Sequence, residues 1–179
     1  IGKPFYVMRK AGGTANPRLL TRDTALDPHR TELARQIGRE MARLHRIRPP
    51  RTDLDFLGEA PANPAAQRIS ELYGFLDSLP KAYPALEWGL RWLELNRPVP
   101  SPAVLCHRDF RTGNYMVSDG HLTGVLDWEF AGWSDPLEDI GWFCARCWRF
   151  GADEREAGGV GSRDDLYAGY EEEAGAALD

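Results

Sequence analysis

Carboxylate and amide side chains stand between short apolar runs in the segment CHRDFRTGNYMVSDGHLTGVLDWEFAGW, residues 106–133. Asp109 and Asn114 are five positions apart, and Asp127 follows Asn114 by thirteen positions, at the end of a later apolar run. A loop followed by a hairpin can bring these three side chains to one edge of a small sheet. Oxygen ligands gathered in this way are typical of a site for a metal ion and phosphate groups.

The chemistry of phosphoryl transfer matches these residue types. Magnesium prefers hard oxygen ligands and retains several waters, so the carboxylate of Asp127 and the amide oxygen of Asn114 would suffice together with phosphate oxygens. Asp109 would then be free to accept a proton from an attacking hydroxyl group. Two structural alternatives stay open from the residues alone: Asp109 and Asn114 would cap a turn, or Asp127 would be an ordinary carboxylate at a hairpin end.

Helical periodicity precedes this segment. Asp27 and Pro28 form a predicted helix start, with aspartate as the N-cap and proline at the first helical position. Further helices are predicted over residues 64–79 and from Pro84 to the proline-rich stretch 97–102, where proline cannot continue a helix. The helix after Pro28 presents one apolar face, formed by Leu33, Ile37, Met41 and Leu44.

A hairpin is predicted in the middle of the polar segment. The apolar runs Tyr115–Val117 and Leu122–Leu126 flank an Asp119-Gly120 pair, which favours a tight turn. No linker divides the chain, so we predict one α+β unit over residues 1–179. It is expected to be mainly helical, with a small hairpin whose ends carry the polar residues.

The pattern after Pro136 is helical again and continues through Cys147. Both Cys144 and Cys147 lie on its apolar side, and the chain offers no second cysteine pair for zinc, so we expect both to pack in the core. A last helix is predicted to begin at Ser162, with Asp165 in the position of a capping-box partner.

The bulk composition excludes several classes of protein. The 179 residues carry a formal net charge of −5, which argues against general nucleic-acid binding. Three cysteines cannot form a disulfide framework and indicate a reducing compartment. No apolar run approaches the ~20 residues that span a bilayer. We therefore expect a cytoplasmic protein that binds neither nucleic acid nor a membrane.

Several blocks of sequence resemble one family in the correct order. Residues 107–114, HRDFRTGN, resemble the H-x-D-x-x-x-x-N catalytic loop of kinases. Residues 127–129, DWE, stand where protein kinases carry D-F-G, and residues 132–139, GWSDPLED, resemble the G-x-x-D-P-x-x-D block of the aminoglycoside phosphotransferase and choline kinase group. Leu44-His45 matches the L-H of that group, and residues 4–8, PFYVM, look like its hinge strand.

This resemblance implies a protein-kinase-like fold and a role for each matched residue. Asp109 would be the catalytic base, and His107 would brace its loop. Asn114 and Asp127 would hold Mg²⁺. The cofactor implied is ATP or GTP.

The same resemblance implies a hinge strand over residues 4–10, with Tyr6 and Met8 contacting the nucleotide. The glycine-rich loop and paired lysine of a smaller N-terminal lobe have no counterpart in the sequence. We therefore expect residues 1–179 to be the C-terminal catalytic lobe, for which that N-terminal lobe is the missing partner. Whether the chain is a fragment or a natural short form stays open.

The function expected is ATP-dependent transfer of the γ-phosphate to a hydroxyl group of a small molecule. One alternative is a nucleotide- or ligand-binding pseudokinase module without turnover. A lesser alternative is a choline-like or hydroxyacyl kinase, because the sequence of these blocks looks most like phosphotransferases related to the kinase domains fused to acyl-CoA dehydrogenases. Glu129, Trp133 and Asp135 are the candidate substrate contacts.

Other polar and aromatic residues are expected to serve the scaffold. His45 lies on the apolar side of a helix, which favours a hydrogen-bonded structural histidine over a metal ligand. Asp135 and Asp139 are favoured as helix-start and scaffold residues. Four tryptophans are expected mainly to pack: Trp128, Trp133, Trp142 and Trp148.

Overall fold

The computed structural model describes residues 10–178. The predicted hinge strand at 4–10 lies almost wholly outside this range, together with Tyr6 and Met8. The helices are α1 (Pro17–Arg22), α2 (Arg30–His45), α3 (Pro64–Asp77), α4 (Pro84–Leu95), α5 (Pro136–Cys144) and α6 (Arg163–Ala174). The strands are β1 (Val104–Cys106), β2 (Tyr115–Ser118), β3 (His121–Val125) and β4 (Gly132–Ser134). Short 3₁₀ helices are η1 (Thr24–His29), η2 (Thr52–Leu57), η3 (Trp128–Phe130) and η4 (Arg146–Trp148).

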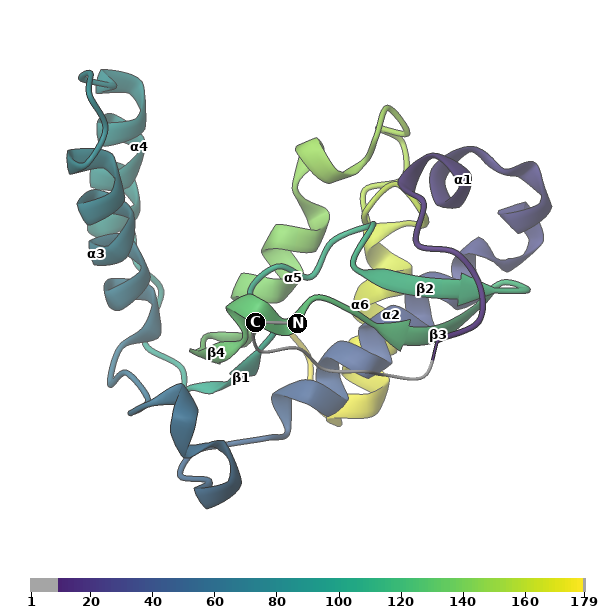
Figure 1. Ribbon diagram of the computed structural model, residues 1–179, viewed down its shortest axis with the longest axis horizontal. Helices are drawn as coiled ribbons and strands as arrows, with labels where there is room; N and C mark the ends of the chain where they lie inside the picture. The colour runs from purple at the N-terminus through teal and green to yellow at the C-terminus, as the bar shows by residue number, and fades with distance from the viewer. Residues whose placement is uncertain (1–9, 179) are drawn as a thin grey trace, which may run out of the picture.

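The core is built on α2 and α6, which run beside each other (Figure 1). The predicted apolar face of α2 is confirmed, since Leu33, Ile37 and Met41 are all fully buried. Leu166 of α6 and Phe143 of α5 complete this cluster from the other side. None of the helices in the described range is long and apolar enough to cross a membrane.

Two glycines allow the backbones of α2 and α6 to pack directly against each other. A Cβ atom added at Gly38 would lie 2.1 Å from the carbonyl oxygen of Leu166, and one added at Gly169 would lie 2.1 Å from that of Arg35. Because the obstacles are backbone atoms, no side-chain rotation can relieve such a clash. The helix pair therefore depends on the absence of side chains at these two positions.

We expect Gly38→Ala to lower the free energy of unfolding by about 1–3 kcal/mol, because α2 and α6 must separate to admit the methyl group. The matched control is Gly74→Ala on α3, where an added Cβ meets no atom within 4 Å. That change should be neutral or stabilising by up to about 1 kcal/mol, because alanine is the better helix former. Thermal unfolding of both variants checks this, and equal melting temperatures would contradict the close-approach argument.

The predicted helices over 64–79 and from Pro84 are confirmed as α3 and α4. They form a helical hairpin that projects from the body of the molecule (Figure 1). Ile69 and Leu90 are 9% exposed, whereas Leu86 is 55% and Trp88 is 74% exposed. The hairpin thus buries a narrow apolar seam and leaves much of its apolar surface open.

The predicted β-hairpin is confirmed as β2 and β3. Asp119 and Gly120 have φ values of 51° and 75°, so both turn residues are left-handed, as in a type I′ turn. β1 pairs antiparallel with β4, with Val104 opposite Ser134. This second pair was not predicted, because β4 is only three residues long and shows no alternation.

Two element boundaries differ from those predicted. The α-helix does not begin at Asp27 and Pro28, which lie within η1; α2 begins at Arg30. Asp23 caps η1, and the carboxylate of Asp27 instead accepts a hydrogen bond from Arg30 Nε at 2.7 Å. Sequence periodicity could not separate a 3₁₀ turn from the first turn of the α-helix.

The helix after Pro136 ends at Cys144, not at Cys147. Ala145 is extended, with ψ of 139°, and directs the chain into η4. Cys144 is buried, as predicted, but Cys147 is exposed, so the prediction that both cysteines pack in the core is wrong for Cys147. The predicted last helix is confirmed, since Ser162 caps α6 by accepting a hydrogen bond from the amide of Asp165.

Candidate active site

A buried carboxylate sets the path of the loop that follows β1. Asp139 of α5 is fully buried, and its two oxygens accept hydrogen bonds from the backbone amides of His107 at 2.8 Å and Arg108 at 2.7 Å. Arg108 has a φ of 64°, a conformation that non-glycine residues rarely adopt unless their surroundings impose it. Asp139 thus holds the chain in the turn that leads to Asp109.

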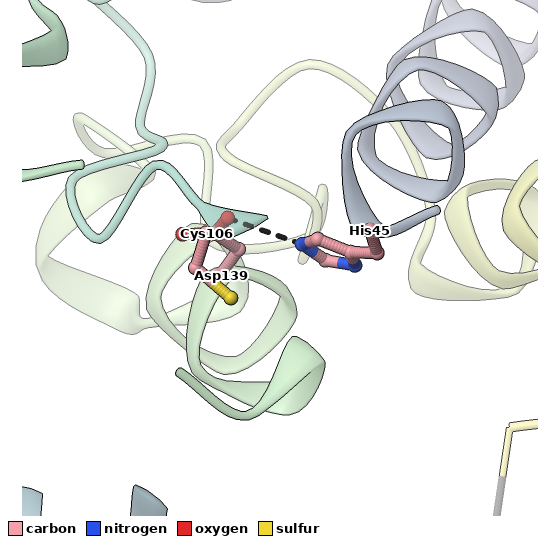
Figure 2. A group of neighbouring side chains, drawn as sticks. All are labelled: His45, Cys106 and Asp139. Carbon is pink, nitrogen blue, oxygen red and sulfur yellow. Dashed lines mark hydrogen bonds and ion pairs between the residues drawn. The ribbon is translucent and has the colours of Figure 1, made fainter. Parts of the chain in front are cut away.

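Figure 2 shows Asp139 with His45 of α2 and Cys106 of β1, whose ligand-type atoms lie within 4.8 Å of one another. His45 bonds Asp139 through Nε2 at 3.2 Å and Tyr170 through Nδ1 at 2.9 Å. Burial, together with the charge of Asp139, raises the pKa of the Cys106 thiol far above its usual range. A protonated thiol is a poor metal ligand, and the Asp139 carboxylate already accepts three hydrogen bonds. His45 and Asp139 are hydrogen-bonded scaffold residues, as predicted, and Cys106 donates to the carbonyl oxygen of Asp135.

His107 joins the loop to the strand that leads to Asp127. Its ring is fully buried; Nδ1 accepts a hydrogen bond from the amide of Asp109 at 3.3 Å, and Nε2 lies 2.8 Å from the carbonyl oxygen of Leu126. A ring that accepts at one nitrogen and faces a carbonyl with the other is a neutral imidazole with its proton on Nε2. The ring therefore braces two segments that the sequence separates by 19 positions.

The side chain of Asp109 is held by three donors and is 15% exposed. Trp142 Nε1 donates to Oδ1 at 2.8 Å. Asn114 Nδ2 and Arg111 Nε donate to Oδ2 at 2.7 and 3.1 Å. The predicted pair Asp109 and Asn114 is thus brought into direct contact, and the carboxylate has a defined orientation at the surface.

The orientation of the Asn114 amide follows from its partners. Its nitrogen faces two acceptors, the carboxylate of Asp109 at 2.7 Å and the backbone oxygen of Asp109 at 3.0 Å. Only the NH₂ group can donate to both, so the amide oxygen points away from them. Within the described part of the chain no donor bonds this oxygen, which leaves it available to a cation.

Asp127 lies beside Asn114 because the amide of Leu126 donates to the carbonyl oxygen of Asn114 at 2.8 Å. The backbone of Asp127 is left-handed, with φ of 65° and ψ of 59°, and its side chain is exposed. Residues 10–178 contain no hydrogen-bond donor to its carboxylate. The hard oxygen atoms of Asn114, just before β2, and of Asp127, just after β3, are a donor set that suits Mg²⁺, which retains waters and accepts phosphate oxygens in its remaining positions.

The three predicted substrate contacts are dispersed. Glu129 is exposed in η3. Trp133 is 7% exposed and donates its indole N–H to the carbonyl oxygen of Gly58 at 3.1 Å. Asp135 caps α5 and accepts a hydrogen bond from Ser101 at 2.6 Å. No hydrogen bond between described residues joins any of these three side chains to Asp109, and their role as substrate contacts stays a prediction.

A charged network ties α3 to the loop. Arg108 pairs with Glu71 of α3 at 2.8 Å, and Arg68 pairs with Glu138 of α5 at 3.1 Å. Burial raises the pKa of Glu71, but hydrogen bonds from Gln67, Arg68 and Arg108 outweigh this effect, so its net pKa is lowered. The residue before the candidate base is thereby connected to the projecting helical hairpin.

Trp142 and Arg111, which contact Asp109, were not predicted as site residues. Trp142 stands three positions after Asp139 on α5, so the two side chains share one helix face and reach the same loop. The signal available in the sequence for this contact was a tryptophan three positions after the scaffold carboxylate of Asp139. Trp142 is 40% exposed, so the expectation that it serves mainly as a packing residue is incomplete.

A family model described as the phosphotransferase enzyme family (APH) matches residues 1–175. Among solved structures, a protein of Ralstonia eutropha JMP134 provisionally assigned as an aminoglycoside phosphotransferase is similar, with a TM-score of 0.68 and 20% identity over 94% of this chain and 54% of that one. The macrolide 2′-phosphotransferase MphH of Brachybacterium faecium gives a TM-score of 0.55 and 22% identity, over 83% of this chain and 47% of that one.

A third similar structure is the ternary complex of APH(2″)-IIa with streptomycin and ATP, with a TM-score of 0.57 and 16% identity. It covers 96% of this chain and 56% of that one. The chain therefore spans about half the length of these structures. At these identities the likeness establishes the fold, which is the helical lobe of a kinase-like phosphotransferase.

Proposed function

Because this chain belongs to the phosphotransferase enzyme family, we propose that it carries the catalytic base and the metal ligands of an ATP-dependent small-molecule kinase. The acceptor would be a hydroxyl group. The observation that carries the proposal is the side-chain contact between Asp109 and Asn114, which orients a carboxylate and leaves an amide oxygen free beside Asp127.

Each residue has one task in this proposal. Asp109 accepts the proton of the acceptor hydroxyl. Asn114 and Asp127 hold Mg²⁺ through oxygen atoms, and the ion would neutralise phosphate charge. His107 keeps the loop and the end of β3 together. ATP supplies the phosphoryl group: the acceptor oxygen bonds to the γ-phosphorus while the bond to the β-phosphate oxygen breaks.

The remaining parts of the site are proposals that rest on family membership. Tyr6 and Met8 would contact the nucleotide from a hinge strand over residues 4–10. Residues 1–179 would form the C-terminal lobe, with a smaller N-terminal lobe completing the nucleotide site. The structure that contains ATP and streptomycin supports ATP as the phosphate donor and a small hydroxylated molecule as the acceptor.

We expect magnesium-ATP to raise the melting temperature of the chain. At a concentration of a hundred times the dissociation constant, a ligand adds about 2.7 kcal/mol to the free energy of unfolding. For a chain of this size, that corresponds to a rise of about 5–11 °C. Asp127→Asn should lose most of the rise, because a neutral amide replaces a charged metal ligand.

The matched control is Asp119→Asn in the β2–β3 turn, which makes the same chemical change at an exposed left-handed position and should keep the full rise. ATP with EDTA in place of magnesium should give little rise for any variant. A rise that survives in Asp127→Asn, or that needs no magnesium, would contradict the proposed metal site.

A further inference from the structure

The candidate base and three other side chains form a closed ring of contacts. Trp142 Nε1 donates to Asp109 Oδ1 at 2.8 Å, and Arg111 Nε donates to Asp109 Oδ2 at 3.1 Å. The rings of Trp142 and Trp148 pack edge to face, with their centroids 5.3 Å apart. The guanidinium of Arg111 lies 4.7 Å from the ring centroid of Trp148. We call Asp109, Arg111, Trp142 and Trp148 the base-holding cluster.

We propose that Trp142 is a positioning residue for the base: its indole N–H fixes Asp109 Oδ1 as the oxygen that receives the acceptor proton. The proposal rests on the proposed function of Asp109.

Within residues 10–178, the Asp109 carboxylate has one open position for a further hydrogen bond. Each carboxylate oxygen can accept about two hydrogen bonds. Oδ2 already accepts two, from Asn114 and Arg111, whereas Oδ1 accepts one, from Trp142. Among the described residues, one acceptor position therefore stays open, and it is on Oδ1. The indole N–H occupies the other position of Oδ1 and so determines the direction in which the open one points.

The support behind Trp142 is rigid. α5 carries Asp139 one helical turn before Trp142, and Asp139 holds the backbone amides of the same loop. The Trp148 ring packs against the Trp142 ring. Trp142 is 40% exposed and the Asp109 side chain is 15% exposed, so both lie at the surface, where we place the approach of the acceptor hydroxyl to Oδ1.

The proposed reaction transfers one proton and one phosphoryl group. The O–H bond of the acceptor breaks and its proton passes to Asp109 Oδ1. The acceptor oxygen forms its bond to the γ-phosphorus of ATP, and the electron pair of the broken P–O bond stays on the departing ADP. Without the indole N–H, Oδ1 has two open positions and the described residues hold the carboxylate only through Oδ2, so fewer bound complexes have the productive alignment.

The contact itself can be tested without nucleotide or acceptor. The chain has six tryptophans, and a ¹H–¹⁵N spectrum shows one indole signal for each. Trp142→Phe removes and so assigns the Trp142 signal. We expect Asp109→Ala to shift that signal more than the other indole signals and to accelerate its hydrogen exchange, because the N–H loses its carboxylate partner. A Trp142 signal that does not respond to Asp109→Ala would overturn the proposal.

The functional part is tested by magnesium-dependent ATP hydrolysis of the whole protein, with water in the place of the hydroxyl acceptor. Trp142→Phe keeps an aromatic ring against Trp148 and removes the N–H donor together with the second ring of the indole. We expect kcat to fall by about 10- to 100-fold, the loss of one hydrogen bond to a charged group. The KM for ATP should stay unchanged, because Trp142 contacts the base and not the metal ligands.

Trp88→Phe is the matched control. Trp88 is 74% exposed on α4 and its indole N–H makes no hydrogen bond among the described residues, so the same chemical change there should leave kcat near the wild-type value. Equal kcat values for Trp142→Phe and Trp88→Phe would overturn the positioning role. If the wild-type protein neither binds magnesium-ATP nor hydrolyses it, the proposed function fails and the positioning role fails with it, even where the indole contact is present.

Discussion

Asp109→Asn is expected to lower the kcat of phosphoryl transfer by about 10²- to 10⁴-fold, the usual contribution of a general base. The amide is nearly the same size as the carboxylate but cannot take up the acceptor proton. Binding of magnesium-ATP should be retained, because the proposed metal ligands are Asn114 and Asp127. Steady-state kinetics on the whole protein, with calorimetric titration of ATP in the presence of magnesium, measure the two quantities separately.

Asp119→Asn serves as the control for this substitution too, since it makes the same chemical change in the β2–β3 turn. Its kcat should equal that of the wild type. Undiminished turnover in Asp109→Asn would show that another group accepts the proton. Loss of ATP binding together with turnover would show instead that Asp109 is needed to hold the nucleotide or the metal.

Asp139→Ala is expected to lower the free energy of unfolding by about 3–9 kcal/mol. The substitution leaves the amides of His107 and Arg108 and the His45 ring without their acceptor, and each orphaned group costs about 1–3 kcal/mol. A protein of this kind is stable by only about 5–15 kcal/mol. Urea unfolding should show the change as a lower midpoint, and the melting temperature should fall by about 6 °C or more.

The control for this prediction is Asp153→Ala. Asp153 also pairs with a partner, Arg146 at 2.6 Å, but both side chains are largely exposed, so the change should cost less than about 1 kcal/mol. If Asp139→Ala unfolds at the same urea concentration as Asp153→Ala, the buried carboxylate is not what holds the catalytic loop.

Local features of the chain were predicted well because their causes are local. The hairpin follows from an Asp119-Gly120 pair whose two residues both adopt a left-handed backbone. The buried face of α2 follows from apolar residues at helical spacing. The cap at Ser162 follows from a hydroxyl group and an acidic residue three positions apart. In each case a few neighbouring residues carry the whole signal.

Boundaries that depend on distant contacts were predicted less well. The side chain of Arg30 donates to Asp27 and also to the backbone oxygen of Leu20, which anchors the turn before α2. The end of α5 at Cys144 depends on the extended backbone of Ala145, and it leaves Cys147 exposed. A period of 3.6 residues continues across both places and does not reveal the interruption.

The sequence by itself determined which polar side chains form the candidate site. The spacing of Asp109, Asn114 and Asp127 around a predicted hairpin was sufficient to predict that two carboxylates and an amide lie at one sheet edge. The helical patterns predicted the body that carries them, and the order of the motifs indicated the family. These features can be predicted from the sequence because strand and helix periods determine which side chains share an edge or a face.

The tertiary structure decided which groups hold Asp109. Trp142 reaches Asp109 across 33 positions of sequence, and Asp139 reaches the amides of His107 and Arg108 across 32 and 31 positions. Both contacts exist because α5 packs against the loop after β1, and that packing depends on the buried apolar surface of the whole core. Periodicity records which side of a helix is apolar, but the partners of its polar side chains are determined only when the elements meet in space.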